Sequence, residues 1–455
     1  MAEYHPDRET LERYSCGGLL PEESAWIERH LRSGCAVCQR TVDGILATFA
    51  PAAQAPDIAS NMPSDPAWDE EECWRRLFTR LEQRVSLINL ERAAAPGLVD
   101  EILRLPREER AAHAGHRYRT LAVCELLIER SFEEGFEDPP RSVEIAELAI
   151  LLAERLDAEH YGHAVVQDLR ARAWAYLGNA RRISSDLLGA EQALAHAEAL
   201  AEEGSADPLE EARRLDLKAS LLSDQGWFEK AAETLGVVID IYDEVRDPHR
   251  KGRALISQGL FLSYAGHPEK TVERIRQGLA LIDPATESRL VLMARHNLAW
   301  ALNDCGRPEE ALRHLESFRP CYAEFPNAWT ALRLQWLEGR IAAGLGRLDE
   351  AEDRLLDVRR SFVEQGLDYD ASMVTLDLAA LYLRESRGAE VRKLAAEMLP
   401  IFLSQDVHRQ ALAALAAFQQ AAEMDRVTPR LVQEITAYLL RARRNPGLRF
   451  EGSER

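Results

Sequence analysis

Apolar residues recur at helical spacing over nearly the whole chain from residue 68 to residue 446. Glycine or proline separates one apolar stretch from the next, and no segment shows the strict apolar–polar alternation of a half-buried strand. Residues 51–67 contain four prolines and almost no helical pattern, which is typical of a linker. The pattern therefore predicts an all-α protein whose main helical region follows a linker.

Inside the helical region a hairpin motif recurs every 40 residues, and an earlier copy lies 41 residues upstream of the regular ones. Each copy places a small residue in a first helix, then a turn residue, then a second small residue in a second helix. The turn residues are Gly226, Gly266, Gly306, Gly346 and, in a worn copy, Ser386. The small residues are Gly178, Ala219, Gly259, Ala299, Gly339 and Ala379 in first helices, and Ala190, Ala231, Thr271, Ala311, Ala351 and Val391 in second helices.

Small side chains let two antiparallel helices approach closely across such a turn. One hairpin cannot bury its apolar faces alone, so neighbouring hairpins must stack. The pattern of a small residue, a large apolar residue, a turn glycine and an alanine resembles the tetratricopeptide repeat over about residues 165–400. The resemblance implies a right-handed solenoid of helical hairpins. The family's period is about 34 residues, so a period of 40 predicts longer helices.

Composition and repeat register divide the chain into five predicted segments. Both helical flanks of the array are expected to cap its exposed apolar ends. The segments are a zinc-binding helical module over residues 1–50, a linker over 51–67, a helical N-terminal part of the array over 68–160, tetratricopeptide-like repeats over 161–404, and capping helices with a tail over 405–455.

The net charge of the chain indicates which classes of partner it is unsuited to bind. Lys and Arg number 56 against 76 Asp and Glu, a formal charge of −20, which disfavours nucleic acid and anionic lipid. No stretch reaches the roughly 18–20 apolar residues that a membrane span needs, and the first residues do not form a secretion signal. We therefore expect a cytoplasmic protein without direct nucleic-acid or membrane contacts.

The seven cysteines are odd in number and scattered, which argues against a disulfide framework. Four of them fall within helical patterns, and we expect these to be buried small apolar residues. They are Cys73, Cys124, Cys305 and Cys321.

Residues 1–50 contain a possible metal site. His30, Cys35 and Cys38 bring an imidazole and two thiols within nine residues, and a Cys-x-x-Cys pair places both sulfur atoms on one side of a tight turn. Zinc binds such nitrogen and sulfur ligands tetrahedrally and requires a fourth. His5 and Cys16 are the candidates for that fourth position.

These ligands lie within a longer pattern: Gly17-Gly-Leu19, Pro21-Glu22-Glu23, His30-Leu31 and Cys35-x-x-Cys38. The pattern resembles the zinc-binding anti-sigma factor domain of bacteria over residues 4–48, although four residues rather than the usual three separate His30 from Cys35. The resemblance implies a closed structural Zn²⁺ site formed by His5, His30, Cys35 and Cys38, and a sigma factor as partner. The alternatives are Cys16 in place of His5, a metal-free hairpin, or thiolates that sense oxidants.

In helical-hairpin arrays the first helices line a concave face. Arginine occupies four of six positions six residues before the small anchor, and tryptophan appears at two other facing positions. Arginine pairs with carboxylates and tryptophan offers flat apolar area, so we predict a groove for an acidic or C-terminal peptide, with Trp300 and Trp336 as anchors. The alternative is that the arginines are solvated or pair with acids of neighbouring helices. The predicted groove residues are Arg172, Asn179, Arg182, Arg213, Arg253, His296, Trp300, Asn303, Arg333, Trp336 and Arg340.

The sequence has no Gly-x-Ser-x-Gly, no phosphate-binding glycine loop and no His-Glu-x-x-His. We therefore expect a regulatory protein rather than an enzyme, with an anti-sigma-like zinc module and a repeat array that binds a second protein. One alternative is a scaffold or adaptor in which the zinc module is only structural. Another is a sensor whose groove binds a small ligand.

Overall fold

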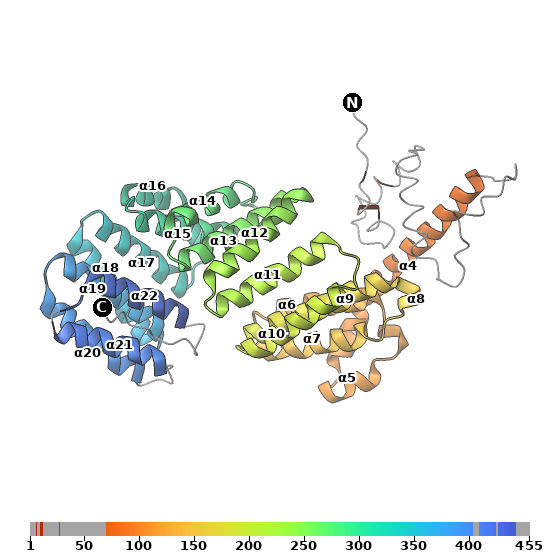
Figure 1. The fold of residues 1–455 in the computed structure, drawn as a ribbon, viewed down its shortest axis with the longest axis horizontal. Coiled ribbons are helices and arrows are strands. Elements are labelled where there is room, and N and C mark those ends of the chain that lie inside the picture. The colour runs from red at the N-terminus through yellow and green to blue at the C-terminus, as the bar shows by residue number, and fades with distance from the viewer. Residues whose placement is uncertain are drawn as a thin grey trace, which may run out of the picture. The chain divides into compact units, whose positions relative to one another are not determined.

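The computed structural model describes residues 70–403, 409–424 and 426–442, together with Pro6, Thr10, Leu11 and Ile27. Every regular element in these residues is a helix, and they contain no strand (Figure 1). The prediction of an all-α protein is confirmed for this part of the chain. None of its helices is long and apolar enough to cross a membrane. The linker and the zinc candidates His5, Cys16, His30, Cys35 and Cys38 lie outside the described residues.

The chain forms two compact units that divide between Leu217 and Lys218, within the predicted repeat region. In the first unit, α6 packs against α7, α9 packs against α10 and α7, and α4 packs against α6. The helices up to this division are α4 (Glu70–Arg104), α5 (Arg107–His113), η1 (His116–Tyr118), α6 (Leu121–Glu134), α7 (Pro139–Ala153), α8 (Ala158–Tyr161), α9 (His163–Ile183) and α10 (Leu187–Ala201), followed by α11 (Pro208–Asp224), which crosses it.

The second unit is a succession of helical hairpins joined by tight turns (Figure 1). Its hairpins pair α13 with α14, α15 with α16, α17 with α18, α19 with α20 and α21 with α22, and α22 also packs on α19. The helices are α12 (Phe228–Glu244), α13 (Pro248–Tyr264), α14 (Pro268–Leu279), α15 (Ser288–Asp304), α16 (Pro308–Phe318), η2 (Arg319–Glu324), α17 (Ala328–Gly344), α18 (Leu348–Glu364), α19 (Asp368–Arg384), α20 (Gly388–Leu403), α21 (Arg409–Glu423) and α22 (Pro429–Ala442).

The 40-residue period appears directly in the helix boundaries. The first helices α11, α13, α15, α17 and α19 each contain 17 residues, and their first residues are 208, 248, 288, 328 and 368. The second helices vary more, since α14 has 12 residues and α16 has 11, whereas α12 and α18 have 17. The first helices thus keep a constant length and spacing, and the hairpins differ from one another in the length of the second helix.

The predicted turn residues all adopt a left-handed backbone conformation. Gly226, Gly266, Gly306 and Gly346 have φ between 71° and 82°, and Ser386 in the worn copy has φ 60°. A residue without a Cβ enters this region freely, whereas serine does so at a cost. The periodic glycines are therefore helix-ending residues, as the turn motif predicts.

The predicted small residues lie where paired helices approach most closely, and all of them are buried. A Cβ added to Gly259 would lie 2.6 Å from Cγ1 of Ile275 on the partner helix, and one added to Gly178 would lie 2.9 Å from Cγ of Leu194. A larger side chain at either position would push the two helices apart. The small residues therefore set the spacing within each hairpin.

Each unit has its own apolar core. In the second unit one cluster contains Phe318 and Leu298, and another contains Phe362 and Phe418, all buried. The prediction that the later cysteines are buried is correct for Cys124 but wrong for Cys305 and Cys321, which are half-buried. Cys305 follows the last residue of α15 and Cys321 lies in η2, so both occupy hairpin ends, where packing is incomplete.

Candidate functional site

The strongest candidate site in the second unit is carried by successive first helices. Among these first helices, α13 contacts α15, α15 contacts α17 and α17 contacts α19. Seven of the predicted groove residues lie on α13, α15 and α17, together with the exposed Met293 in the same register. This set is called here the first-helix wall: Arg253, Met293, His296, Trp300, Asn303, Arg333, Trp336 and Arg340.

An aromatic pair and an arginine form the centre of the wall. The rings of Trp300 and Trp336 meet edge to face with centroids 5.1 Å apart, and the guanidinium of Arg340 lies 4.3 Å from the Trp300 ring centroid. Trp336 is buried and also packs on Phe362, whereas Trp300 is half-buried. A cation over an indole face contributes about 0.5–2 kcal/mol. The exposed part of Trp300 can therefore contact an apolar group of a partner, and the buried Trp336 packs against Trp300 and holds it in place.

Two aspartates hold Arg340 in place. Its guanidinium donates to Asp304 Oδ1 at 2.7 Å and to Asp377 Oδ1 at 2.6 Å, and Trp336 Nε1 donates to Asp377 Oδ2 at 2.7 Å. Burial disfavours the charge of Arg340, but the two carboxylates outweigh burial and raise its pKa. The network joins α15, α17 and α19, so it fixes three first helices to one another.

His296 occupies a buried position next to the tryptophans. Its Nδ1 shares a hydrogen bond of 2.7 Å with the Tyr322 hydroxyl, and its ring packs on Trp300. Burial, with the nearby charge of Arg333, lowers the pKa of His296 well below its usual value, so the ring is neutral near pH 7. Its Nε2 is buried and has no hydrogen-bond partner in the described part of the chain. His296 therefore supports the wall and does not present a charge to a partner.

The arginines of the wall differ in whether their charge is neutralised. Arg253 donates to Glu287 at 2.5 Å, and Arg340 is held by its two aspartates. Arg333 is half-buried and, among the residues that the structure describes, forms no ion pair. Met293 lies six residues before the small residue Ala299 of α15, the position that Arg333 occupies relative to Gly339 of α17. Met293 is 49% exposed. The wall thus combines one uncompensated cation with accessible apolar surface.

Comparison with known proteins identifies the fold. No family profile matches the chain, and no curated protein matches its sequence. A solved Rap protein complexed with competence and sporulation factor matches with a TM-score of 0.52 and 14% identity, over 71% of this chain and 87% of that one. The chain shares the fold of a Rap protein.

Two further structures resemble the chain less well. The apo form of RapI matches with a TM-score of 0.48 and 12% identity, covering 70% of this chain and 86% of that one. Aspartyl phosphate phosphatase F from Bacillus subtilis matches with a TM-score of 0.47 and 13% identity, covering 88% of this chain and 95% of that one. The Rap match agrees with the tetratricopeptide-like array of hairpins seen in the structure.

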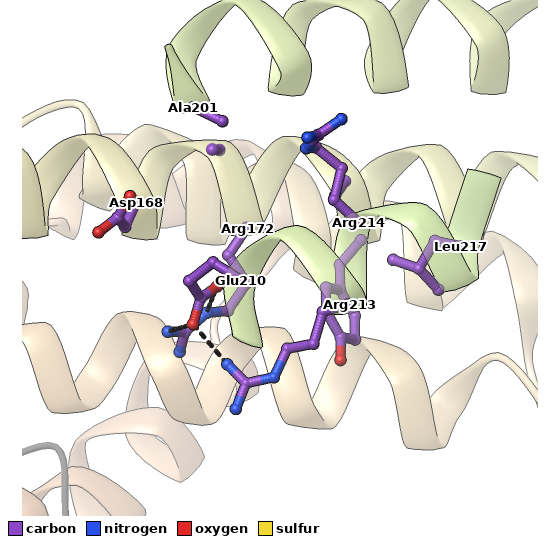
Figure 2. Close-up of a pocket in the computed structure, with 10 residues that line it drawn as sticks. Asp168, Arg172, Ala201, Glu210, Arg213, Arg214 and Leu217 are labelled. Carbon is purple, nitrogen blue, oxygen red and sulfur yellow. Dashed lines mark hydrogen bonds and ion pairs between the residues drawn. The ribbon is translucent and has the colours of Figure 1, made fainter. Parts of the chain in front are cut away.

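Four predicted groove residues lie in the first unit, and two of them, Arg172 and Arg213, line a small cleft between α9, α10 and α11 (Figure 2). Arg172 of α9 and Arg213 of α11 both donate to Glu210, and Arg172 also pairs with Glu125 at 3.5 Å. Arg214 extends to the opposite side from Arg213 (Figure 2). It pairs with Glu198 of α10 at 3.3 Å. Arg172 and Arg214 therefore pair with acids of neighbouring helices, as the alternative interpretation of the sequence describes, whereas Arg213 pairs with Glu210 of its own helix.

The other two groove residues of this unit are also engaged within the fold. Asn179 is buried, and its Oδ1 accepts from Arg182 at 3.0 Å. The cleft has an accessible volume of only about 20 Å³, which is room for about one water molecule. Burial raises the pKa of Asp168, which lines the cleft, to about 6, despite hydrogen bonds from Ser205. A cleft of this size is unsuited to a small-molecule ligand.

The remaining groove residue, Asn303, has a buried Oδ1 without a hydrogen-bond partner in the described residues. No group of three histidine, cysteine or acidic side chains suited to a metal occurs in the described ranges. The sequence interpretation missed Asp304, Tyr322 and Asp377, because these residues are not at the register positions that face the groove. The only sequence signal for Asp377 is that an acidic residue stands among apolar residues in the middle of a first helix.

Proposed function

We propose that the chain is a regulatory protein that binds a polypeptide segment of a partner on the first-helix wall of its second unit, without catalysing a reaction. The bound segment carries a carboxylate, from an acidic side chain or a free C-terminus, next to an apolar side chain. The carboxylate pairs with Arg333 and the apolar side chain packs on Met293 and the exposed part of Trp300.

The observation that carries this proposal is the contrast among the arginines. In the first unit Arg172 and Arg213 are paired with Glu210, and in the second unit Arg253 and Arg340 are paired with acids of their own unit. A charge-assisted bond to a partner is available only from an arginine without such an acid. Arg333 meets this condition, and it lies next to a rigid aromatic support, which reduces the entropy that binding costs.

The structural comparison is consistent with a binding role. The Rap protein that shares this fold was solved in complex with competence and sporulation factor. A repeat array of this kind offers an extended surface of neighbouring helices rather than an enclosed cavity. The proposal for the present chain rests on the residues of its own wall.

A peptide-binding experiment tests the proposal. Peptides displayed with free C-termini would be selected on the full chain, and the selected peptide would be titrated by fluorescence anisotropy in carboxylate and amidated forms. We expect Arg333→Glu to weaken binding by about tenfold or more, because it replaces an ion pair with repulsion. Arg360→Glu on the second helix α18 is the control, since Arg360 is exposed and forms only a local pair with Asp357.

Three results would contradict the proposal. No peptide would be selected, or Arg333→Glu would bind as tightly as wild type, or Arg360→Glu would weaken binding equally. Arg253→Glu gives a further comparison, because it removes an arginine that is already paired with Glu287. We expect its effect on binding to be smaller than that of Arg333→Glu.

We further propose that residues 1–50 bind one structural Zn²⁺ through His5, His30, Cys35 and Cys38 and hold a sigma factor, with the array binding a second protein. The order of motifs in the sequence supports this proposal. Plasma mass spectrometry of the purified chain is expected to find one zinc per chain, lost in a Cys35→Ser and Cys38→Ser double variant. Zinc without sigma-factor binding would instead favour a scaffold with a purely structural zinc module.

A further inference from the structure

An exposed aromatic cluster lies in the first unit at the end of α6. Phe132 and Phe136 pack edge to face with ring centroids 5.5 Å apart, and Phe132 packs on Tyr176 of α9 with centroids 6.0 Å apart. Phe136 is 76% exposed and Phe132 is 39% exposed. Two adjacent phenylalanines in water are unfavourable for the free chain, and clustered exposed apolar side chains mark interaction surfaces.

The exposure of Phe136 is not the result of a loose loop. Phe136 lies in the turn between α6 and α7, where the backbone N–H of Asp138 donates to Glu134 at 2.8 Å and the Asp138 side chain caps α7. A Cβ added to the preceding Gly135 would lie 3.0 Å from Cδ1 of Ile183, so the turn packs tightly against α9. The fold thus holds the ring in solvent, and a partner would not need to order it.

Glutamates flank the two phenylalanines along the chain. Glu129, Glu133 and Glu137 are exposed, and within the described part of the chain no cation pairs with any of them. Glu134, by contrast, is neutralised by Arg141 at 3.1 Å. Glu129 and Glu133 are four residues apart on one helix face, where two like charges destabilise the helix. An external cation would relieve this repulsion.

We propose that Glu129, Phe132, Glu133, Phe136 and Glu137, called here the acidic aromatic patch, dock a basic amphipathic helix of a partner protein. The apolar side chains of that helix pack on the two phenylalanine rings. Its lysines or arginines pair with the three glutamates and approach the ring faces, where a cation is attracted by the aromatic quadrupole. This site is independent of the first-helix wall and of the peptide proposed to bind there.

The test uses a defined probe and the full chain. The probe is a fluorescent peptide of about 18 residues with leucines on one helical face and lysines on the other, long enough to form a helix. The wild-type chain would be titrated into this peptide and binding followed by fluorescence anisotropy. We expect Phe132→Ala with Phe136→Ala to weaken binding about tenfold or more. Leu188→Ala on α10 is the matched control, because Leu188 is 68% exposed in the same unit. The change of all three glutamates to glutamine is expected to weaken binding and to flatten its salt dependence.

Phe136→Ala alone provides a second variant, since this ring contacts only Phe132 among the aromatic pairs and its loss leaves the Tyr176 contact intact. Circular dichroism would verify that each variant is folded. The proposal is overturned if the phenylalanine variants bind as wild type, if Leu188→Ala loses as much affinity, or if a leucine–glutamate peptide binds equally well. Sedimentation that shows a wild-type dimer broken by Phe136→Ala would assign the patch to a second copy and would also overturn it.

Discussion

Replacing Asp377 with asparagine tests how the first-helix wall is held together. Asparagine has nearly the same shape, and its one side-chain oxygen can still accept the hydrogen bond from Trp336 Nε1, but its amide nitrogen then faces Arg340 and cannot accept. The change therefore removes one negative charge and the bond that Arg340 donates to Asp377. Arg340 would then keep its cation beside Asp304 alone. The perturbation therefore removes the Arg340–Asp377 ion pair and leaves the side-chain shape and the Trp336 hydrogen bond in place.

The structure sets the expected size of the effect. The side chains of Arg340 and Asp377 are each 19% exposed, so the pair lies between an exposed ion pair, worth about 0–1 kcal/mol, and a fully buried one, whose disruption costs about 3–5 kcal/mol. Because Asp304 still compensates part of the charge, we expect Asp377→Asn to lower the free energy of unfolding by about 2 kcal/mol. For a unit of this size that corresponds to a fall in Tm of about 4–8 °C.

Urea unfolding followed by tryptophan fluorescence measures the effect, since Trp300 and Trp336 lie in the network. Asp357→Asn is the control, because it makes the same chemical change in an exposed pair with Arg360, and we expect a loss below about 0.5 kcal/mol there. Equal losses in the two variants, or a loss below about 0.5 kcal/mol for Asp377→Asn, would refute the reasoning that burial strengthens the network.

Three further predictions concern the repeat and the cleft. Ser386→Gly is expected to raise the free energy of unfolding by about 0.5–1 kcal/mol in urea titrations, because glycine adopts the positive φ of this turn without strain; an unchanged or lower value would contradict this. Gly259→Ala is expected to lower it by about 1–3 kcal/mol through the clash across its hairpin, whereas Gly236→Ala, with only one ordinary contact, is expected to raise it by about 0.5–1 kcal/mol; the same sign for both would argue against close helix approach. Burial raises the pKa of Asp168 to about 6, so stability contributed by the protonated carboxyl is lost as pH rises through that value. The free energy of unfolding of Asp168→Asn should therefore rise relative to that of wild type between about pH 4 and pH 7, and a constant difference would contradict the raised pKa.

Much of the architecture is predictable from the sequence because it depends on local properties. The left-handed turns at Gly226 and Gly306 follow from the absence of a Cβ, and they ended the helices at the expected positions. The buried small residues, such as Gly259 and Ala351, follow from the need of paired helices to approach closely. These features repeat, so a single chain displays the same requirement several times.

The sequence does not show in the same way which of the predicted groove residues a partner can reach. Arg253 and Arg333 stand at equivalent positions of their repeats, yet Arg253 is neutralised by Glu287 and Arg333 has no such acid in the described part of the fold. His296 and Trp336 also occupy equivalent register positions, but both are buried. Register alone therefore identifies which residues are near the wall, without showing which of them a partner can reach.

The sequence by itself determined the helical class, the 40-residue hairpin unit, the turns and the close-packed small residues, because each depends on neighbouring positions along one chain. Only the tertiary structure decided which charges are compensated and which aromatic rings are exposed. The partner of Arg340 on the following first helix, Asp377, lies 37 residues away. Such contacts arise from the packing of one repeat on another, and they determine the free energy that remains available for binding.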